Sequence, residues 1–271
     1  MKIFKNKKDL VREINKIKNL SFVPTMGGLH KGHAKLIKSA KRKTKKIIVS
    51  IYINPKQFNS KKDFKNYPRN LKKDLNFLKK EKVNFVFLPN YKDVYGFIPK
   101  NNIFLDIKSR LLCGKFRPGH FKGVVNVVNR LLEIIKPKYI ILGKKDYQQF
   151  FLLKKHIKKN KIKTSIILHN TVRDKYGIAL SSRNKLLTKK QLRKAAKVYK
   201  LLKSIKTRIN IKNFENTSYK IKNKLKEIGL KKIDYISILN LKDLSKPKSR
   251  NLNFNIFIAY YIGKVRLIDN L

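Results

Sequence analysis

The sequence predicts an α/β protein in which helices cover both faces of a parallel sheet and a smaller α+β domain follows. Apolar, β-branched runs alternate with helical patterns up to about residue 170, an order typical of a parallel sheet. Polar stretches follow three of these runs, at the sheet edge where such folds bind ligands. Beyond Thr171 the pattern changes to two helices and then two strands. We therefore expect one domain over residues 1–175 and a second over residues 176–271.

The length and composition fit a cytoplasmic protein of two domains. A chain of 271 residues, 42% of them hydrophobic, can bury one large or two modest cores. The single Cys113 excludes an internal disulfide and suits a reducing compartment. Residues 1–14 lack the apolar segment of a secretory signal. No apolar run approaches the ~20 residues that cross a bilayer, so we expect no membrane association.

The net charge is unusually positive. The chain has 69 Lys and Arg residues against 15 Asp and Glu, a formal charge of +54. Such a charge often indicates a nucleic-acid partner. The lysines are spread along the whole chain, however, and Lys, Asn and Ile are abundant together, as a genome rich in A and T would produce. Composition alone leaves both explanations open.

The first half of the chain shows the alternation of strands and helices. Residues 1–20 have apolar side chains at helical spacing, which predicts a short amphipathic helix. Strands are predicted at residues 22–23, 47–53, 85–88, 139–142 and 165–168. Helices are predicted from about residue 32 and at residues 70–80, 124–135 and 146–159. Residues 90–121, rich in Gly and Pro, are predicted to be an irregular segment, and a segment that long is often functional.

The second half is predicted to contain two helices followed by two strands. Residues 179–184 form a polar turn, and Thr188 is placed to cap a helix that extends to residue 202. A second helix is predicted at residues 214–228, where Gly229 ends it. Antiparallel strands are predicted at residues 233–239 and 256–262.

Residues 21–40, SFVPTMGGLHKGHAKLIKSA, hold the strongest sign of chemistry. A strand end passes through a glycine loop into a helix that begins near Gly32. Glycine lets the backbone approach a ligand, and a helix N-terminus attracts anions, commonly phosphate. His30 and His33 are three residues apart, so both imidazoles can face the same way. Either histidine alone is more often a surface residue without function, but the combined HxGH pattern favours a nucleotide-phosphate site.

Seven motifs occur in the order found in one enzyme family. They are VPTMGGLHKGH, SIYINPKQF, YPRN, RPGHFKGV, GKKDYQQ, ALSSRN and RLIDN. By these motifs the chain resembles the pantothenate synthetase family over residues 22–270, whereas HxGH alone is shared by a whole nucleotidyltransferase superfamily. The resemblance implies a Rossmann-like domain that binds ATP and pantoate, and a C-terminal lid domain.

The resemblance also implies a reaction. The family joins pantoate to β-alanine in pantothenate and coenzyme A biosynthesis, forming AMP and pyrophosphate through a pantoyl adenylate. ATP would bind with Mg²⁺, which would be held through the nucleotide phosphates rather than by a protein metal site. A homodimer is implied as well, although nothing in the residues themselves indicates one.

The resemblance assigns roles to individual residues. The implied catalytic residues are His30, His33, Lys145 and Arg183. Their donor groups suit the negative charge that grows on a leaving pyrophosphate. The implied ATP-binding residues are Met26, Gly27, Gly28, Leu29, His30, Lys31, Gly32, His33, Gly143, Lys144, Lys145, Asp146, Val172, Leu180, Ser181, Ser182 and Arg183. Gln57 and Gln149 match the pantoate-binding glutamines, and a neutral amide offers a hydroxy-acid both a donor and an acceptor.

Several of these assignments have an alternative. His33 matches a family proton donor but could equally be only a phosphate anchor. Val172 falls at an adenine-contact position but could equally be a core residue. Asp74 matches an acidic residue near the Mg²⁺–phosphate region, although an aspartate in the first turn of a helix also suits the helix dipole. Without the motifs, Gln57 and Gln149 would be taken for surface glutamines.

Three positions depart from the family pattern. Lys144 and Cys113 stand where the family usually has glutamate, and Lys122 stands where arginine is common. These changes could reflect drift toward a basic composition, or they could weaken the nucleotide loop. We expect activity to survive, at an equal or reduced rate, because the histidines, glutamines, Lys145 and Arg183 of the pattern are all present.

Two other functions compete with this interpretation. A different nucleotidyltransferase would share the HxGH pattern, but Gln57 and Gln149 belong to the pantoate pocket. A nucleic-acid binder that kept an old fold would have no use for both histidines and both glutamines. We therefore expect no specific nucleic acid, and any such binding should be independent of sequence and weaken steeply with salt.

Overall fold

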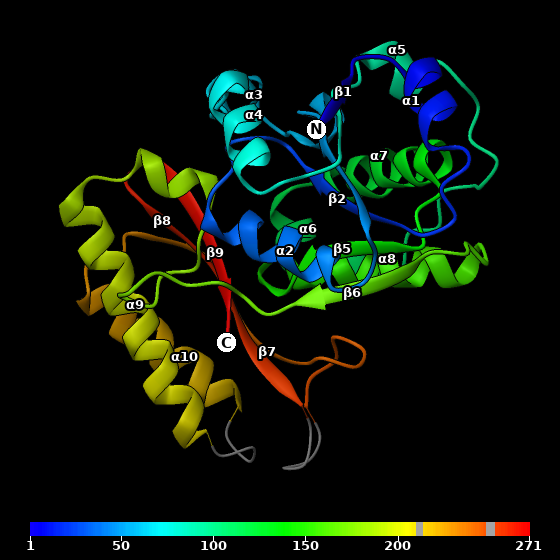
Figure 1. Ribbon diagram of the computed structural model, residues 1–271. Helices are drawn as coiled ribbons and strands as arrows, with labels where there is room; N and C mark the ends of the chain where they lie inside the picture. The colour runs from blue at the N-terminus through cyan, green and yellow to red at the C-terminus, as the bar shows by residue number, and fades with distance from the viewer. Residues whose placement is uncertain (210–213, 248–252) are drawn as a thin grey trace. The chain divides into compact units, whose positions relative to one another are not determined.

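The computed structural model describes residues 1–209, 214–247 and 253–271, which form two compact units. The first unit contains Met1–Arg110 and Arg117–Thr171 (Figure 1). The second contains Val172–Leu271 together with the short segment Leu111–Phe116. The second unit is therefore built from two separate parts of the chain.

The first unit is organised around a six-stranded parallel sheet. Its strands are β1 (Lys2–Phe4), β2 (Leu20–Thr25), β3 (Lys46–Ile51), β4 (Phe85–Phe87), β5 (Tyr139–Gly143) and β6 (Ser165–His169). They lie in the order β1-β4-β3-β2-β5-β6, and every pair is parallel. From β2 the chain extends the sheet first through β3 and β4 and later, on the other side, through β5 and β6. The edge outside the carboxyl ends of β2 and β5 is thus the switch point where parallel sheets bind ligands.

Helices connect these strands. They are α1 (Lys7–Ile14), α2 (Lys31–Lys41), α3 (Lys61–Lys65), α4 (Leu71–Lys80), α5 (Tyr91–Tyr95), α7 (His120–Ile135) and α8 (Tyr147–Lys159). Single 3₁₀ turns occur at η1 (Pro55–Gln57), η2 (Ile107–Arg110) and η3 (Lys144–Asp146). The sheet and the connecting helices confirm the predicted α/β class. The irregular segment 90–121 contains α5, η2 and the short helix α6 (Leu112–Phe116).

The prediction of one helix through residues 1–20 is wrong at both ends, because β1 precedes the helix and β2 already begins at Leu20. Residues Lys2–Phe4 form the edge strand β1, in which Ile3 pairs with Val86, and only Lys7–Ile14 are helical. Three residues are too few to show a strand period, and the pairing partner lies some 80 residues away in the sequence.

Both faces of the central strands are buried. Val23 and Val49 pack with Ile37 of α2 and Leu78 of α4 in one core cluster, and all four side chains are fully buried. Neighbouring strand residues point to the opposite face, and there Phe22 is completely buried as well. This explains the continuous apolar runs of β2 and β3, because a strand covered on both faces has no polar side to present.

The second unit packs helices against a three-stranded antiparallel sheet. Its strands are β7 (Lys232–Asn240), β8 (Phe254–Ile262) and β9 (Val265–Asn270), in that order. Its helices are α6, α9 (Lys189–Arg208), α10 (Phe214–Glu227) and the 3₁₀ turn η4 (Ser182–Leu186). Figure 1 shows α9 and α10 side by side, and Leu202, Ile221 and Ile258 form part of their shared core with the sheet.

Local signals in this unit behave as the sequence predicts, with one strand added. The Thr188 side chain accepts from the Gln191 backbone N–H at the start of α9, which completes a capping box. Gly229 has a φ of +86° just past α10, as expected for a glycine that ends a helix. The terminal motif at residues 266–270 forms β9, a strand that the sequence patterns do not predict.

Segment 111–116 is held in the second unit by Cys113. Its Sγ lies 3.1 Å from the Tyr235 hydroxyl and 3.7 Å from both terminal nitrogens of Arg266. Arg266 also donates from Nε to Asp234 at 2.8 Å. Burial, together with the neighbouring sulfur, raises the pKa of Tyr235 well above its usual value, so its hydroxyl stays protonated.

Candidate functional site

The loop between β2 and α2 needs its glycines. Gly27 and Gly28 have φ angles of +79° and +64°, in the left-handed region where a side chain is strained. Both are buried, and the loop leads directly into Lys31, the first residue of α2. The backbone therefore turns sharply at the carboxyl end of β2 and exposes a helix N-terminus there, as the sequence predicts.

The buried carboxylate of Asp74 holds the backbone of this loop. Asp74, in the first turn of α4, is 4% exposed and accepts two backbone hydrogen bonds. Its Oδ2 accepts from the Gly28 N–H and its Oδ1 from the Leu29 N–H, each at 2.8 Å. A Cβ added to Gly27 would lie 2.9 Å from Oδ2, so glycine is also needed for this close approach.

The two histidines cap the helix that follows. His30 is the N-cap of α2, and its Nδ1 accepts from the Gly32 N–H at 3.1 Å. The Nδ1 of His33 accepts from the His30 N–H at 3.2 Å, and the two ring centroids are 4.1 Å apart. Because both Nδ1 atoms accept, each neutral ring carries its proton on Nε2. The pair can therefore present two N–H donors at the start of one helix.

The turn after β3 brings Gln57 against the glycine loop. Gln57 is 8% exposed, and its Nε2 lies 2.7 Å from the Met26 sulfur. Asn54 orients the same amide by donating to Oε1 at 3.2 Å. Asn54 in turn accepts from the Tyr95 hydroxyl at 2.9 Å, and burial raises the pKa of Tyr95 above its usual value, so this donor keeps its proton. Two predicted site segments are thus in direct contact.

Two side chains of the RPGHF motif contact the main-chain carbonyl of Gln57. Arg117 donates from Nη2 to the Gln57 carbonyl oxygen at 3.0 Å, and His120 contacts the same oxygen through Nδ1 at 2.8 Å. Arg117 also lies 3.1 Å from the other ring nitrogen of His120. Sequence reasoning missed the roles of Asn54, Arg117 and His120, although each stands inside a quoted motif.

The third polar stretch follows β5. Phe22 of β2 pairs with Ile140 of β5, so the strands are neighbours and their carboxyl ends share one edge. The η3 turn after Gly143 contains Lys144 and Lys145, and the Nζ of Lys145 lies 3.2 Å from Oδ1 of Asp146. Partly buried Gln149 follows in the first turn of α8. The predicted site residues of the first unit therefore all belong to the carboxyl edge of the sheet.

The remaining predicted site residues belong to the second unit. Leu180 donates its N–H to the Val172 carbonyl at 2.9 Å, which joins the two predicted nucleotide contacts. Ser181 is the N-cap of η4, and its Oγ accepts from the Arg183 N–H at 3.3 Å. Ser182 is buried, whereas Arg183 is partly exposed. The serine–serine–arginine segment is thus an ordered, capped turn rather than a featureless loop.

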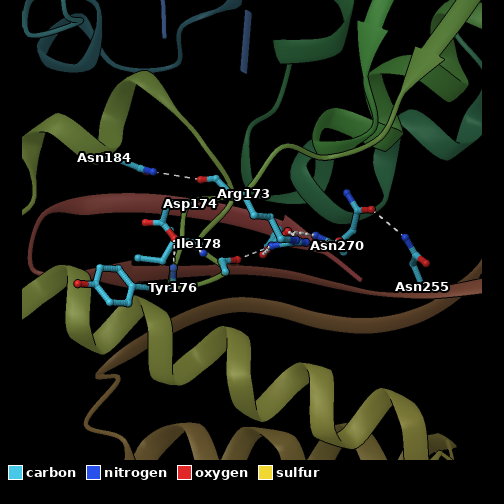
Figure 2. A network of polar contacts seen from close by, with 10 residues as sticks. Arg173, Asp174, Tyr176, Ile178, Asn184, Asn255 and Asn270 are labelled. Carbon is cyan, nitrogen blue, oxygen red and sulfur yellow. Dashed lines mark hydrogen bonds and ion pairs between the residues drawn. The ribbon is translucent and has the colours of Figure 1, made fainter. Parts of the chain in front are cut away.

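An ion pair anchors the start of this segment. Arg173 donates to both carboxylate oxygens of Asp269, at 2.7 and 2.9 Å, and also to the Asn270 carbonyl at 3.1 Å (Figure 2). The side chains of the pair are only 19% and 10% exposed. The guanidinium also stacks on the Tyr199 ring at 4.5 Å, and the backbone of Arg173 bridges to Ala179. The C-terminal motif therefore supports the segment that precedes Leu180.

Two further contacts stabilise the same turn. Asp174 Oδ1 accepts from the N–H groups of Tyr176 and Ile178, both at 2.9 Å (Figure 2). Asn184 donates to the Ala179 carbonyl at 3.1 Å. These bonds fix the backbone just before the serine pair.

The chemical character of the site is cationic and rich in donors. The first unit offers the N-terminus of α2, two histidines and Lys145 near the switch point, and such groups favour a polyphosphate. Within the described residues, no group of three or more His, Cys, Asp and Glu side chains has the arrangement of a metal site. The helices described there also include none long and apolar enough to cross a membrane.

Comparison with known proteins gives a consistent result. The family model for pantoate-beta-alanine ligase matches residues 2–271. The pantothenate synthetase of Fervidobacterium nodosum is 39% identical over 264 residues, covering 95% of this chain and 92% of its own. That of Francisella tularensis subsp. novicida is 41% identical over 274 residues, covering 97% and 95%.

Solved structures agree with the sequence comparison. The crystal structure of pantothenate synthetase from Thermus thermophilus has a TM-score of 0.92 at 29% identity, with 100% of this chain and 99% of the other covered. The pantoate-beta-alanine ligase of Francisella tularensis, complexed with beta-gamma ATP and beta-alanine, has a TM-score of 0.83 at 41% identity, with 100% and 97% covered. On this evidence, the chain belongs to the pantoate-beta-alanine ligase family.

Proposed function

We propose that this ligase condenses pantoate with β-alanine through a pantoyl adenylate. The observation that carries the proposal is the contact between Gln57 and Met26, because it places an amide beside the glycine loop and its helix N-terminus. An amide suits a hydroxy-acid, and the helix start suits a phosphate chain. The two ligands of the first step would then lie next to each other. The Francisella relative, complexed with beta-gamma ATP and beta-alanine, supports ATP and β-alanine as the other two substrates.

The chemistry proceeds in two displacements. A carboxylate oxygen of pantoate attacks the α-phosphorus of ATP, the bond from that phosphorus to the bridging oxygen breaks, and pyrophosphate leaves. The neutral amine of β-alanine then attacks the acyl carbon of the adenylate. The bond from that carbon to the AMP oxygen breaks, the amine loses a proton, and pantothenate and AMP are formed.

The first displacement needs help where charge develops on pyrophosphate. His30 and His33 can donate from Nε2, because their Nδ1 atoms are occupied as acceptors of backbone N–H groups. Lys145 adds a positive charge from the neighbouring loop, and the N-terminus of α2 adds its dipole. Preorganised donors of this kind stabilise the transition state more than the ground state.

Binding of the acid is assigned to the two glutamines. Gln57 is held on both sides, by Asn54 at its side chain and by Arg117 at its main chain, so its amide is preorganised. Gln149 follows from the next loop along the edge. Neither residue brings a negative charge that would repel a carboxylate.

Magnesium would enter with the nucleotide. Both carboxylate oxygens of Asp74 accept from backbone N–H groups, so its geometry is that of a backbone anchor rather than of a metal ligand. Mg²⁺ would then be held through the triphosphate oxygens, where it neutralises negative charge.

The second unit is proposed to act on the bound nucleotide. Ser181, Ser182 and Arg183 would contact the phosphates as parts of a lid, and Val172 would contact the adenine. The capped turn at η4 supports this role, because it offers an ordered set of donors. From the family resemblance alone, the protein is also proposed to be a homodimer in the cytoplasm.

The test is a product analysis with omitted substrates. Purified protein is incubated with ATP, Mg²⁺, pantoate and β-alanine, and AMP, ADP and pantothenate are quantified. We expect AMP and pantothenate in equal amounts, and no AMP when pantoate is left out. Formation of ADP, or AMP release that does not depend on pantoate, would show that the adenylate route is wrong.

A further inference from the structure

The Asp74 carboxylate is engaged entirely by the main chain of the glycine loop. Its oxygens accept from two consecutive amides, those of Gly28 and Leu29, across more than 40 residues of sequence. Both distances are 2.8 Å, and the side chain is 4% exposed. A carboxylate so buried is costly unless hydrogen bonds compensate it, and here the backbone supplies both. The contact therefore depends both on the position of the two carboxylate oxygens and on their negative charge.

We propose that Asp74 is a positioning residue that sets the backbone of the loop and, through it, the placement of His30 and His33. Leu29 immediately precedes the helix cap at His30, so fixing its amide fixes where the cap begins. Gly27, whose φ is left-handed, also lies close to this carboxylate, because an added Cβ would be 2.9 Å from Oδ2. The inference deepens the proposed function and rests on it, because it assigns the two histidines to the reacting phosphates.

The expected consequence is an effect on turnover rather than on substrate affinity. A displacement of catalytic groups by about 1 Å can reduce a rate by about a hundredfold. Asp74→Asn preserves the shape of the side chain but leaves one acceptor oxygen, and its NH₂ group would face a backbone N–H. The loop would then lose one hydrogen bond and gain an opposed pair of donors. We expect kcat for AMP formation to fall about ten- to a hundredfold, with smaller changes in KM for ATP and pantoate.

The chain offers a control with the same kind of main-chain contact. Glu133 of α7, which is partly buried, also accepts from two consecutive backbone amides, Lys100 at 2.9 Å and Asn101 at 3.0 Å, and in addition from the side chains of Asn101 and Asn129. It lies near the end of α7 that leads into β5, and thus at the opposite edge of the sheet from the site. Glu133→Gln therefore removes a comparable anchor without touching the glycine loop, and we expect its turnover to equal that of the unaltered protein.

The decisive measurement does not depend on activity. Amide hydrogen exchange is followed in peptides that cover residues 26–33 and residues 98–102 of the full-length protein. We expect Asp74→Asn to accelerate exchange about tenfold or more at Gly28 and Leu29, as the loss of a charge-assisted hydrogen bond implies, and to leave residues 98–102 unchanged. Glu133→Gln should show the reverse pattern. Unchanged exchange in residues 26–33 of Asp74→Asn would overturn the proposal even if the protein makes pantothenate.

A magnesium titration separates positioning from metal binding. If Asp74 positions the loop, the deficit in kcat of Asp74→Asn stays constant as Mg²⁺ is raised at fixed ATP. Recovery of activity at high Mg²⁺ would identify Asp74 as a metal ligand and overturn the proposal. If the unaltered protein forms no AMP with pantoate, the proposed function fails, but the exchange experiment still decides whether Asp74 anchors the loop.

A second variant perturbs the same contact from the loop side. Gly27→Ala places a methyl group 2.9 Å from Asp74 Oδ2, in a backbone conformation that alanine adopts with strain. We expect it to accelerate exchange in residues 26–33, and we expect the two substitutions together to cost less in kcat than the product of their separate effects. Fully multiplicative effects would show that the carboxylate and the loop act independently. This variant also keeps the test valid if Asp74→Asn does not fold.

Discussion

Two segments of the proposed site are held in place by different means. The glycine loop, residues 26–33, is fixed through its own main chain, because Asp74 accepts directly from two of its amides. The segment at residues 179–183 is held at its start, because the Arg173–Asp269 ion pair holds Arg173, whose backbone bridges to Ala179, and Asn184 donates to the Ala179 carbonyl. A main-chain anchor determines backbone position whatever side chains the loop carries. The ion pair acts on Arg173 and so determines where the segment begins, whereas the serines are held by the capped turn η4.

The difference separates chemistry from stability. Substitutions in or under the glycine loop should change the rate, since the histidines that we propose to be catalytic directly follow the anchored amides. Substitutions in the ion pair should mainly change the stability of the second unit, since Asp269 lies in β9, the edge strand that pairs with β8. Variants that remove a functional side chain of the glycine loop, or a side chain that anchors either segment, therefore test this comparison.

The largest effect is expected for His33→Ala. The substitution removes a donor at the start of α2 and the Nδ1 acceptor of the His30 N–H, but it leaves the contacts of Asp74 with Gly28 and Leu29 intact, so these two residues should keep their position. We expect the rate of adenylate formation to fall by about two orders of magnitude or more, the usual scale for losing a group that stabilises developing charge. Single-turnover AMP formation and the free energy of unfolding measure the two effects. A rate close to that of the unaltered protein would reduce His33 to a bystander.

A smaller effect is expected for Gln57→Glu, which changes charge at nearly constant size. The carboxylate would repel the pantoate anion and lose the donor that contacts Met26. An unmade hydrogen bond to a charged group costs about 1–3 kcal/mol, so KM for pantoate should rise about ten- to a hundredfold while KM for ATP moves little. If both constants rise equally, or neither changes, Gln57 does not belong to the acid pocket.

The smallest effect on rate is expected for Asp269→Asn. The pair with Arg173 is largely buried, so its loss should lower the free energy of unfolding by about 1–3 kcal/mol. Glu13→Gln is the control, because the Lys2–Glu13 pair is exposed and should contribute less than about 1 kcal/mol. Denaturant titration measures both variants. A loss of turnover in Asp269→Asn as large as that of Asp74→Asn would show that the two anchors do not differ as described.

Much of the first unit could be predicted from the sequence, because its signals are local. The apolar runs of β2 and β3 and the helix start after Gly28 each need only a few neighbouring residues to be recognised, as does the cap at Thr188 in the second unit. The placement of the three polar stretches at the carboxyl edge follows from the same reasoning, since parallel strands place their following loops at one edge, whereas the roles of single residues in them were assigned by family resemblance.

Most of the parts that were missed depend on partners far away in the sequence; β9, which pairs with the preceding strand β8, is the exception. β1 is a short strand defined by pairing with β4, about 80 residues later. The position of Leu111–Phe116 depends on Cys113 meeting Tyr235, about 120 residues later. The anchoring by Asp74 has the same character, because nothing around it in the helix indicates that its partners are backbone amides of a distant loop.

The central claim, attack of the pantoate carboxylate on the α-phosphorus, can be tested by following one oxygen atom. Pantoate labelled with ¹⁸O in its carboxylate is converted with ATP and β-alanine, and the products are analysed by mass spectrometry. The proposed route predicts one ¹⁸O atom in AMP and none in pyrophosphate, because the bridging oxygen of the adenylate leaves with AMP. Label in pyrophosphate or in inorganic phosphate, or unlabelled AMP, would contradict the account.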